Sequence, residues 1–191
     1  MQITLHRELF ASTNKSLITT LPRFVFEGKV VVIQSESEAI RAVQALRKSS
    51  LLGIDTETRP AFKKGVSHKV ALLQICDGQV CFLFRLNQMG LPACLVELLC
   101  DPSITKVGLS LKDDFLMLRH RQKFHPAGCI DIQHLVGELG IKDMSLQKLF
   151  ANFFRMKISK NAQLSNWEAD VLTAAQQTYA APDAYACILL Y

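Results

Sequence analysis

Two carboxylates at the end of an apolar run are the first residues in this chain whose types and spacing suit chemistry. Asp55 and Glu57 follow the segment 51–54, whose composition is typical of a buried central strand. Side chains two positions apart in a strand point to the same face, so these carboxylates project together. A divalent cation relieves their mutual repulsion and prefers oxygen ligands. A D-x-E pattern also arises by chance, so this pair alone is a weak indication of a metal site.

A second acidic group follows the next short apolar segment, within residues 107–115. Three apolar residues at helical spacing define the buried face of a helix there: Leu111, Phe115 and Leu118. Asp114 lies about 60° from Leu111 around this helix, beside the buried face, whereas Asp113 points nearly opposite. Asp113 also lies three residues after Ser110, where it is expected to complete a capping interaction. Asp114 is therefore the better candidate for a metal ligand.

A tyrosine and a third acidic site stand four residues apart near the end of the chain. Tyr179 and Asp183 share one face of a predicted helix, which Ala186 and Leu190 continue. This pattern predicts a face turned inward, and a buried carboxylate needs a partner. The alternative is a solvated helix acid, which is the commoner place for a lone carboxylate. Pro182 lacks a backbone N–H, so we expect a kink or a helix boundary between Tyr179 and Asp183.

The elements expected to position these groups are strands followed mostly by helices. Strands are predicted over residues 29–34, 51–55, 69–76, 79–85 and 106–109, with Asp77-Gly78 as a hairpin turn. Helices are predicted over residues 35–47, 91–99, 111–121, 130–139, 145–154 and 173–191. This mixture favours a layered α/β fold with a partly antiparallel sheet. Residues 1–28 are weakly patterned, and we expect them to form an extension that wraps the surface of a domain spanning 29–191.

The composition of the chain limits its class. A length of 191 residues with 49% hydrophobic residues suits one globular domain and excludes a disordered chain. The net charge of +5 permits a polyanionic partner without requiring one. None of the six cysteines forms a C-x-x-C pair, so we expect buried reduced thiols and no zinc site. With no secretory signal and no run of about 20 apolar residues, we expect a soluble cytoplasmic protein without membrane contact.

Taken together, the acidic motifs resemble those of a known family. Three motifs occur in this order: Asp55-x-Glu57, Gly108-x5-Asp114 and Tyr179-x3-Asp183. They look like the three exonuclease motifs of the DEDD superfamily, tyrosine subclass. The segments 69–76 and 165–167 are similar to flanking segments of Werner-type and RNase D-type 3′–5′ exonuclease domains. The resemblance covers about residues 29–191, and several motifs in register are far more specific than any one of them.

The resemblance implies a fold, a cofactor and a reaction. The implied fold is the RNase H-like exonuclease fold, a mixed sheet of five or six strands flanked by helices. The implied cofactors are two divalent cations, Mg²⁺ or Mn²⁺, with Asp55 bridging both. Glu57 and Asp183 would complete the tighter site, and Asp114 would hold the second ion. Tyr179 matches the residue that positions the attacking water. The implied function is a metal-dependent 3′–5′ exonuclease that releases nucleoside 5′-monophosphates from DNA or RNA.

Several residues near these motifs suit a nucleic-acid substrate. The candidate substrate-binding residues are Thr56, Arg59, Phe62, Lys63, Lys64, Lys69, Lys160 and Asn166. The basic ones are expected to contact phosphates without reading sequence, although solvated loop lysines are the alternative. Phe62 is expected to stack on a terminal base, with packing beside Pro60 as the alternative. Trp167 is expected in the core.

Two other functions remain open at this point. The main alternative is a catalytically silent nucleic-acid-binding or scaffold protein of the same fold, and a weaker one is a phosphatase acting on small phosphate esters. The intact set of four acidic residues and Tyr179 favours the enzyme. The choice between DNA and RNA depends on contacts to the 2′-OH, which no motif here identifies. No motif indicates a protein partner.

Overall fold

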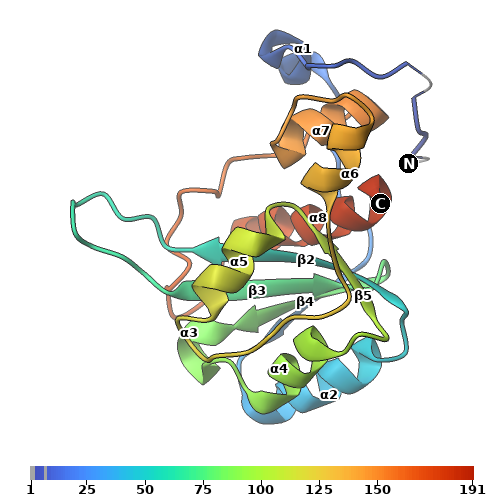
Figure 1. Cartoon of the computed structure of the whole chain (residues 1–191). Coiled ribbons are helices and arrows are strands. Elements are labelled where there is room, and N and C mark those ends of the chain that lie inside the picture. The colour runs from blue at the N-terminus through green and yellow to red at the C-terminus, as the bar shows by residue number, and fades with distance from the viewer. Residues whose placement is uncertain (1–2, 7) are drawn as a thin grey trace.

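The computed structural model describes residues 3–6 and 8–191, and a mixed β-sheet forms its centre. In this part of the chain the sheet has six strands: β1 (Lys29–Ile33), β2 (Leu51–Thr58), β3 (Val70–Cys76), β4 (Val80–Arg85), β5 (Thr105–Gly108) and β6 (Cys129–Asp131). Their order is β1-β4-β3-β2-β5-β6. Only β3 runs antiparallel to its neighbours, so the carboxyl ends of β2 and β5 meet at the same edge (Figure 1).

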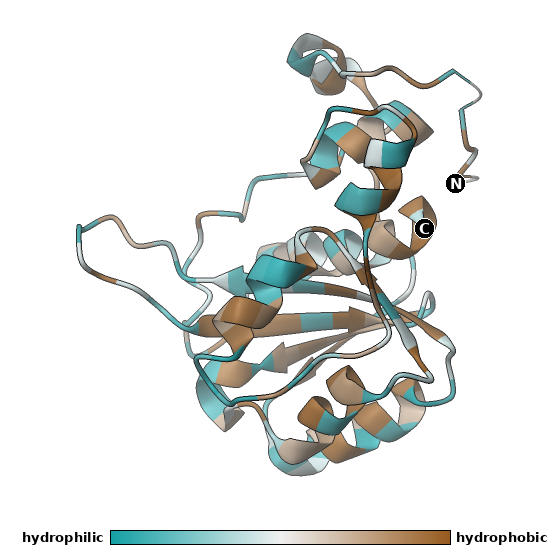
Figure 2. Cartoon of the chain, in the orientation of Figure 1, coloured by the Kyte–Doolittle hydropathy of each residue, from teal (hydrophilic) through white to brown (hydrophobic). Residues whose placement is uncertain are grey.

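Helices cover both faces of this sheet. They are α1 (Lys15–Thr20), α2 (Glu36–Leu46), α3 (Leu86–Met89), α4 (Ala93–Cys100), α5 (Leu111–Leu118), α6 (Ile132–Glu138), α7 (Leu146–Phe154) and α8 (Ala174–Leu190). The apolar sides of α2, α4 and α5 pack on one face, and α8 packs on the other (Figure 1). Every residue of β3 is buried between these layers, and its ribbon is largely hydrophobic (Figure 2). The predicted α/β fold with a mixed sheet flanked by helices is confirmed.

Residues before β1 form hydrogen bonds with α7 and with the turn that follows it. The backbone N–H of Phe10 donates to the Asn152 side chain at 2.9 Å, and that side chain donates back to the Phe10 carbonyl at 2.7 Å. Farther along, the N–H of Phe24 donates to the Lys157 carbonyl at 2.9 Å, and the N–H of Lys157 donates to the Pro22 carbonyl at 2.9 Å. Residues 1, 2 and 7 of the predicted extension lie outside the described part of the chain.

The structure corrects some predicted boundaries. Residues 130–139 were expected as one helix, but residues 129–131 form the edge strand β6 before α6 begins. A strand of three half-buried residues is too short to show the alternation of apolar and polar residues that identifies a strand in a sequence. Helix α5 ends at Leu118, whereas the pattern predicted an end near Arg121. The short helices α1 and α3 were not predicted.

Helix α8 runs without interruption through Pro182, so the expected helix boundary at this position is wrong. A proline inside a helix costs roughly 3 kcal/mol because it removes one backbone hydrogen bond and crowds the preceding turn. On this helix Ala180, Ala181 and Ala184 are all buried against the sheet. Their close packing outweighs the local preference of proline.

The cysteines form no disulfide within the described residues. Cys76, Cys81 and Cys187 are buried, and the remaining three are half-buried. The burial of the first three agrees with the expectation of buried thiols. Among the residues that the structure describes, no helix has the length and apolar character needed to cross a membrane.

Candidate active site

Three carboxylates converge where the end of β2 meets α8. One oxygen each from Asp55, Glu57 and Asp183 lies within 4.8 Å of the others. Asp55 and Glu57 share the face of β2 that α8 covers, as the two-residue spacing predicted. Asp183 and Glu57 are buried, and Asp55 is half-buried. The group therefore brings three ionisable carboxyl groups together in a place with little access to water.

A glycine in β2 allows α8 to lie this close to the sheet. A Cβ atom added at Gly53 would overlap the carbonyl oxygen of Ala184. Gly53 is two residues before Asp55 and faces the same side, and Ala184 directly follows Asp183. Any side chain at this position would push the α8 backbone, and Asp183 with it, away from Asp55.

Asp114 reaches the same edge from the opposite layer, in the first turn of α5. The Thr56 hydroxyl donates to its Oδ1 at 2.6 Å, so β2 holds this carboxylate directly. Gly108 permits the approach, because a Cβ there would overlap Leu111 and lie 2.8 Å from the Ile54 carbonyl oxygen. Asp114 is not one of the three carboxylates that lie within 4.8 Å of one another, but its charge raises the pKa of both Asp55 and Glu57. It is half-buried, as the position next to the buried helix face predicted.

Asp131 is the residue near this site that the sequence interpretation missed. Its carboxylate accepts from the backbone N–H groups of Ser110 at 3.1 Å and Leu111 at 2.8 Å, at the start of α5. The predicted capping interaction between Ser110 and Asp113 is wrong, because Ser110 has a φ of 60° and its side chain makes no cap. Asp113 is exposed. Asp131 is the N-cap of α6, and an aspartate at that position is the sequence signal that could have drawn attention to it. The helix predicted from residue 130 placed Asp131 inside the helix and so hid this signal.

Burial makes this carboxylate cluster hard to ionise. It raises the pKa of Glu57 to about 9 and that of Asp183 to about 7. Burial also raises the pKa of Asp114 to about 6, although the Thr56 hydrogen bond acts against it. The pKa of Asp55 is raised well above its usual value by burial first and then by the charges of Asp183, Asp114 and Glu57. A cation at this point would remove the repulsion and restore the ionised forms.

The cluster fits a divalent metal on its own geometry. The Oδ1 atom of Asp183 is buried without a hydrogen-bond partner, and a buried carboxylate oxygen is costly unless something satisfies it. The donors are all oxygens, which Mg²⁺ and Mn²⁺ prefer over nitrogen or sulfur. Asp55, Glu57 and Asp183 are therefore suited to hold one such ion.

Tyr179 lies one helical turn before Asp183 on the same inward face. It is buried, and its ring packs against that of Trp167 with 5.8 Å between the centroids. Burial and then the charges of Asp183, Glu57 and Asp55 raise the pKa of its phenol far above the usual range. The phenol therefore stays protonated and able to donate a hydrogen bond. Trp167 is fully buried, which confirms its predicted place in the core.

Comparison with known proteins identifies the family. Residues 30–191 match the family described as 3′-5′ exonuclease. The chain belongs to this 3′–5′ exonuclease family. This confirms the resemblance found in the three acidic motifs and does not favour the silent scaffold alternative.

Individual relatives of this exonuclease domain agree in sequence and in fold. A "3′-5′ exonuclease" of Arabidopsis thaliana is 31% identical over 186 residues, which cover 89% of this chain and 65% of the relative. "Exonuclease 3′-5′ domain-containing protein 2" of Homo sapiens is 29% identical over 206 residues, covering 97% of this chain and 33% of that protein. The chain thus spans less than two thirds of the length of these relatives.

A solved structure extends the comparison to the fold. The Aedes aegypti Nibbler EXO domain has a TM-score of 0.80 at 18% identity, over 88% of this chain and 89% of that chain. The shared fold is the RNase H-like exonuclease fold that the motifs implied.

The candidate substrate-binding residues of this exonuclease domain fall into separate places. Four of them line one cavity of about 410 Å³ beside the loop between β2 and β3: Arg59, Phe62, Lys63 and Asn166. The loop projects away from the sheet, and Phe62 is 82% exposed (Figure 1). Lys64 and Lys69 are exposed and do not line this cavity, and Lys160 lines a different one.

Some of these residues already have protein partners. An Arg59 guanidinium nitrogen lies 3.3 Å from a Glu168 carboxylate oxygen. The Asn166 side-chain oxygen accepts from the Glu168 backbone N–H at 3.1 Å. The Thr56 hydroxyl is directed at Asp114, so in this structure it supports the acidic group.

Proposed function

We propose that this chain is a metal-dependent 3′–5′ exonuclease that hydrolyses the terminal phosphodiester of DNA or RNA and releases nucleoside 5′-monophosphates. The observation that supports it best is the buried convergence of Asp55, Glu57 and Asp183 in a chain of the exonuclease family. Asp114 and Tyr179 interact with this group through charge. Phosphodiester hydrolysis places negative charge on the attacking and leaving oxygens, and divalent cations held by such a site would offset it.

The acidic residues would hold two divalent cations, Mg²⁺ or Mn²⁺. Glu57 and Asp183 would complete one site with Asp55, and Asp114 would hold the second ion together with Asp55. When bound, such ions stabilise the charge on both oxygens of an in-line displacement. Solved structures of the EXD2 exonuclease domain, 29% and 30% identical to this chain, were soaked in Mn and in Mg with GMP. The unpartnered oxygen of Asp183 supports the same role here.

Tyr179 acts in this proposal as a hydrogen-bond donor that orients the attacking water. Its raised pKa keeps the phenol protonated throughout the range in which enzymes work, so it does not serve as the base. The ring contact with Trp167 fixes its direction, and the shared helix face keeps it beside Asp183. Thr56 serves to hold Asp114 through its hydroxyl.

The β2–β3 loop is proposed to receive the 3′-terminal nucleotides. Phe62 offers an exposed ring for stacking on a base, and Lys63 supplies positive charge at the same cavity. Arg59 would add its charge by exchanging the Glu168 carboxylate for a phosphate. Such contacts bind backbone and base without selecting a sequence. Lys64, Lys69 and Asn166 would add contacts around this loop.

The test is digestion of matched single-stranded DNA and RNA 20-mers, each labelled at either the 3′ or the 5′ end. With Mg²⁺ or Mn²⁺, the 3′ label is expected to be released first as a nucleoside 5′-monophosphate, and EDTA is expected to stop the reaction. Asp55→Asn is the inactive control. Release of the 5′ label first, internal cleavage, or tight oligomer binding without hydrolysis would overturn the proposal, and the last result would support the silent nucleic-acid-binding alternative.

A further inference from the structure

A second cavity lies away from the β2–β3 loop, between α1 and the turn that follows α7. Its volume is about 560 Å³, and the buried side chains of Ile18 and Ile158 contribute to its lining. Four basic side chains also line it: Lys15, Arg23, Lys157 and Lys160. Among the described residues that line it, none carries a carboxylate. The cavity therefore suits a negatively charged ligand.

The two walls of this cavity come from distant parts of the sequence and are held together firmly. The paired backbone hydrogen bonds of Phe24 and Lys157 join them, and the Lys157 ammonium donates to the Thr19 carbonyl at 2.6 Å. The Lys157 ammonium therefore already has a hydrogen-bond partner within the protein. In the described part of the chain, no ion pair involves Lys15, Arg23 or Lys160, so these three charges are available to a ligand.

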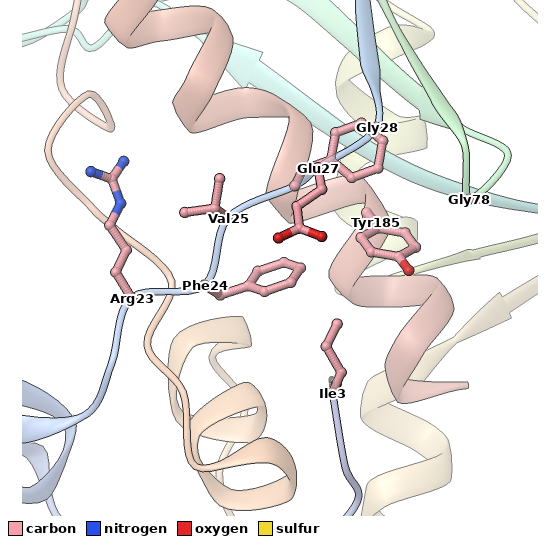
Figure 3. Close-up of a pocket in the computed structure, with 9 residues that line it drawn as sticks. Ile3, Arg23, Phe24, Val25, Glu27, Gly28, Gly78 and Tyr185 are labelled. Carbon is pink, nitrogen blue, oxygen red and sulfur yellow. The ribbon is translucent and has the colours of Figure 1, made fainter. Parts of the chain in front are cut away.

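Arg23 lines this cavity and is exposed. Arg23 also lines the neighbouring pocket of Phe24, Glu27 and Tyr185, and Figure 3 shows its guanidinium pointing away from those three side chains. Because Arg23 is exposed and stands opposite Lys157 in the short parallel bridge, its charge adds to those of the turn after α7. The N-terminal segment therefore supplies two of the three free cations, Lys15 and Arg23.

Lys160 is the cavity residue whose charge acts on the candidate active site. Lys160 lines the cavity and is close enough to Asp183 for its charge to lower the pKa of that carboxylate against the effect of burial. A strand whose 3′ end is held at Asp55, Glu57 and Asp183 must leave the site with its remaining phosphates. A basic surface that starts at Lys160 is suited to bind these phosphates, because single-stranded nucleic acid is bound mainly through its backbone charge.

We propose that Lys15, Arg23 and Lys160 form a phosphate-binding subsite for the single strand upstream of the 3′ end, so that the N-terminal segment is part of the substrate-binding surface. This inference rests on the proposed exonuclease function and extends it to a substrate several nucleotides long. It implies that binding strength grows with oligomer length until the strand reaches Lys15 and Arg23.

The test is equilibrium binding of fluorescent single-stranded 20-mers and trinucleotides, DNA and RNA, by anisotropy. All variants are built on Asp55→Asn protein, so that substrate is not consumed. The double variant Lys15→Ala/Arg23→Ala is expected to weaken 20-mer binding about tenfold and to reduce the slope of log K against log salt by about 1.4, which corresponds to two lost phosphate contacts. The effect on the trinucleotide is expected to be much smaller, because it does not reach the cavity.

The matched control is Lys29→Ala/Lys48→Ala, which removes the same charge from two exposed residues. Lys29 begins β1 and Lys48 lies shortly before β2, so both are at the amino ends of the strands, away from the end of β2 that carries Asp55 and Glu57. Unchanged 20-mer affinity and salt slope in the Lys15/Arg23 variant would overturn the subsite. So would equal weakening by the control pair, or equal weakening for the trinucleotide. If wild-type protein releases no mononucleotide but the Lys15/Arg23 variant still loses 20-mer binding, the exonuclease proposal fails while the subsite stands.

Discussion

Replacing Asp183 by asparagine is expected to stabilise the metal-free protein, even though it removes a residue proposed to hold the metal. The substitution keeps the size of the side chain and removes its charge. In the folded protein burial raises the pKa of Asp183 from 3.8 to about 7, so ionising it there costs free energy that the unfolded chain does not pay. Because the folded state holds this proton more tightly, the free energy of unfolding falls as pH rises from about 4 to about 7.

The size of the effect follows from that shift. About three pH units at 1.36 kcal/mol each give at most about 4 kcal/mol above pH 7, and about 1 kcal/mol near pH 4.5. Removing the Asp183 charge also eases the ionisation of Asp55 and Glu57, which it opposes in the wild-type protein. For a chain of this length, 4 kcal/mol corresponds to a Tm difference on the order of 10 °C.

The assay is thermal unfolding in EDTA at pH values from 4.5 to 8.5, with Asp113→Asn as the control because that carboxylate is exposed. The Tm advantage of Asp183→Asn is expected to grow with pH, while the control stays near the wild type. Excess Mn²⁺ is expected to raise the Tm of the wild type more than that of the variant, since only folded protein with the full ligand set binds it well. Equal Tm values for the wild type and Asp183→Asn at every pH, or a Tm difference between them that does not change with pH, would refute this reasoning.

Three further substitutions test other parts of the site. Asp114→Asn is expected to lower kcat on a 3′-labelled oligomer about a hundredfold, whereas Asp113→Asn has little effect; the reverse order would show that the wrong acid was chosen. Tyr179→Phe is expected to slow turnover tens- to thousandfold and to keep both Mn²⁺ affinity and the rising limb of the pH–rate profile; a lost limb would make the phenol the base. Gly53→Ala is expected to lower both Tm and activity because its Cβ would overlap the Ala184 carbonyl. Gly137→Ala in α6 meets open space and is expected to leave Tm unchanged or to raise it. Equal Tm values for these two variants would contradict the packing argument.

The parts of the site that depend on local periodicity could be predicted from the sequence. The two-residue spacing of Asp55 and Glu57 places both on one face of β2, and the four-residue spacing of Tyr179 and Asp183 places both on one face of α8. The position of Asp114 beside the apolar stripe of α5 follows from the same kind of argument. In each case one element alone decides where the side chain points.

The parts that depend on contacts between distant elements could not be predicted. The start of α5 is capped by Asp131, twenty residues beyond Leu111, rather than by its own neighbours. The continuity of α8 through Pro182 depends on packing against the sheet, which local propensity does not include. The requirement for glycine at Gly53 becomes visible only when α8 is placed on β2. The basic cavity likewise arises from two segments more than a hundred residues apart.

The central claim is that the carboxylates of β2 and α8 hold the divalent cation needed for hydrolysis at a 3′ end. The most direct measurement is an anomalous difference map from crystals of the wild-type protein soaked in Mn²⁺. We expect a strong peak within coordination distance of Asp55, Glu57 and Asp183, and its absence in crystals of Asp55→Asn treated in the same way. A map with Mn²⁺ bound elsewhere and no peak among these three carboxylates would contradict the account.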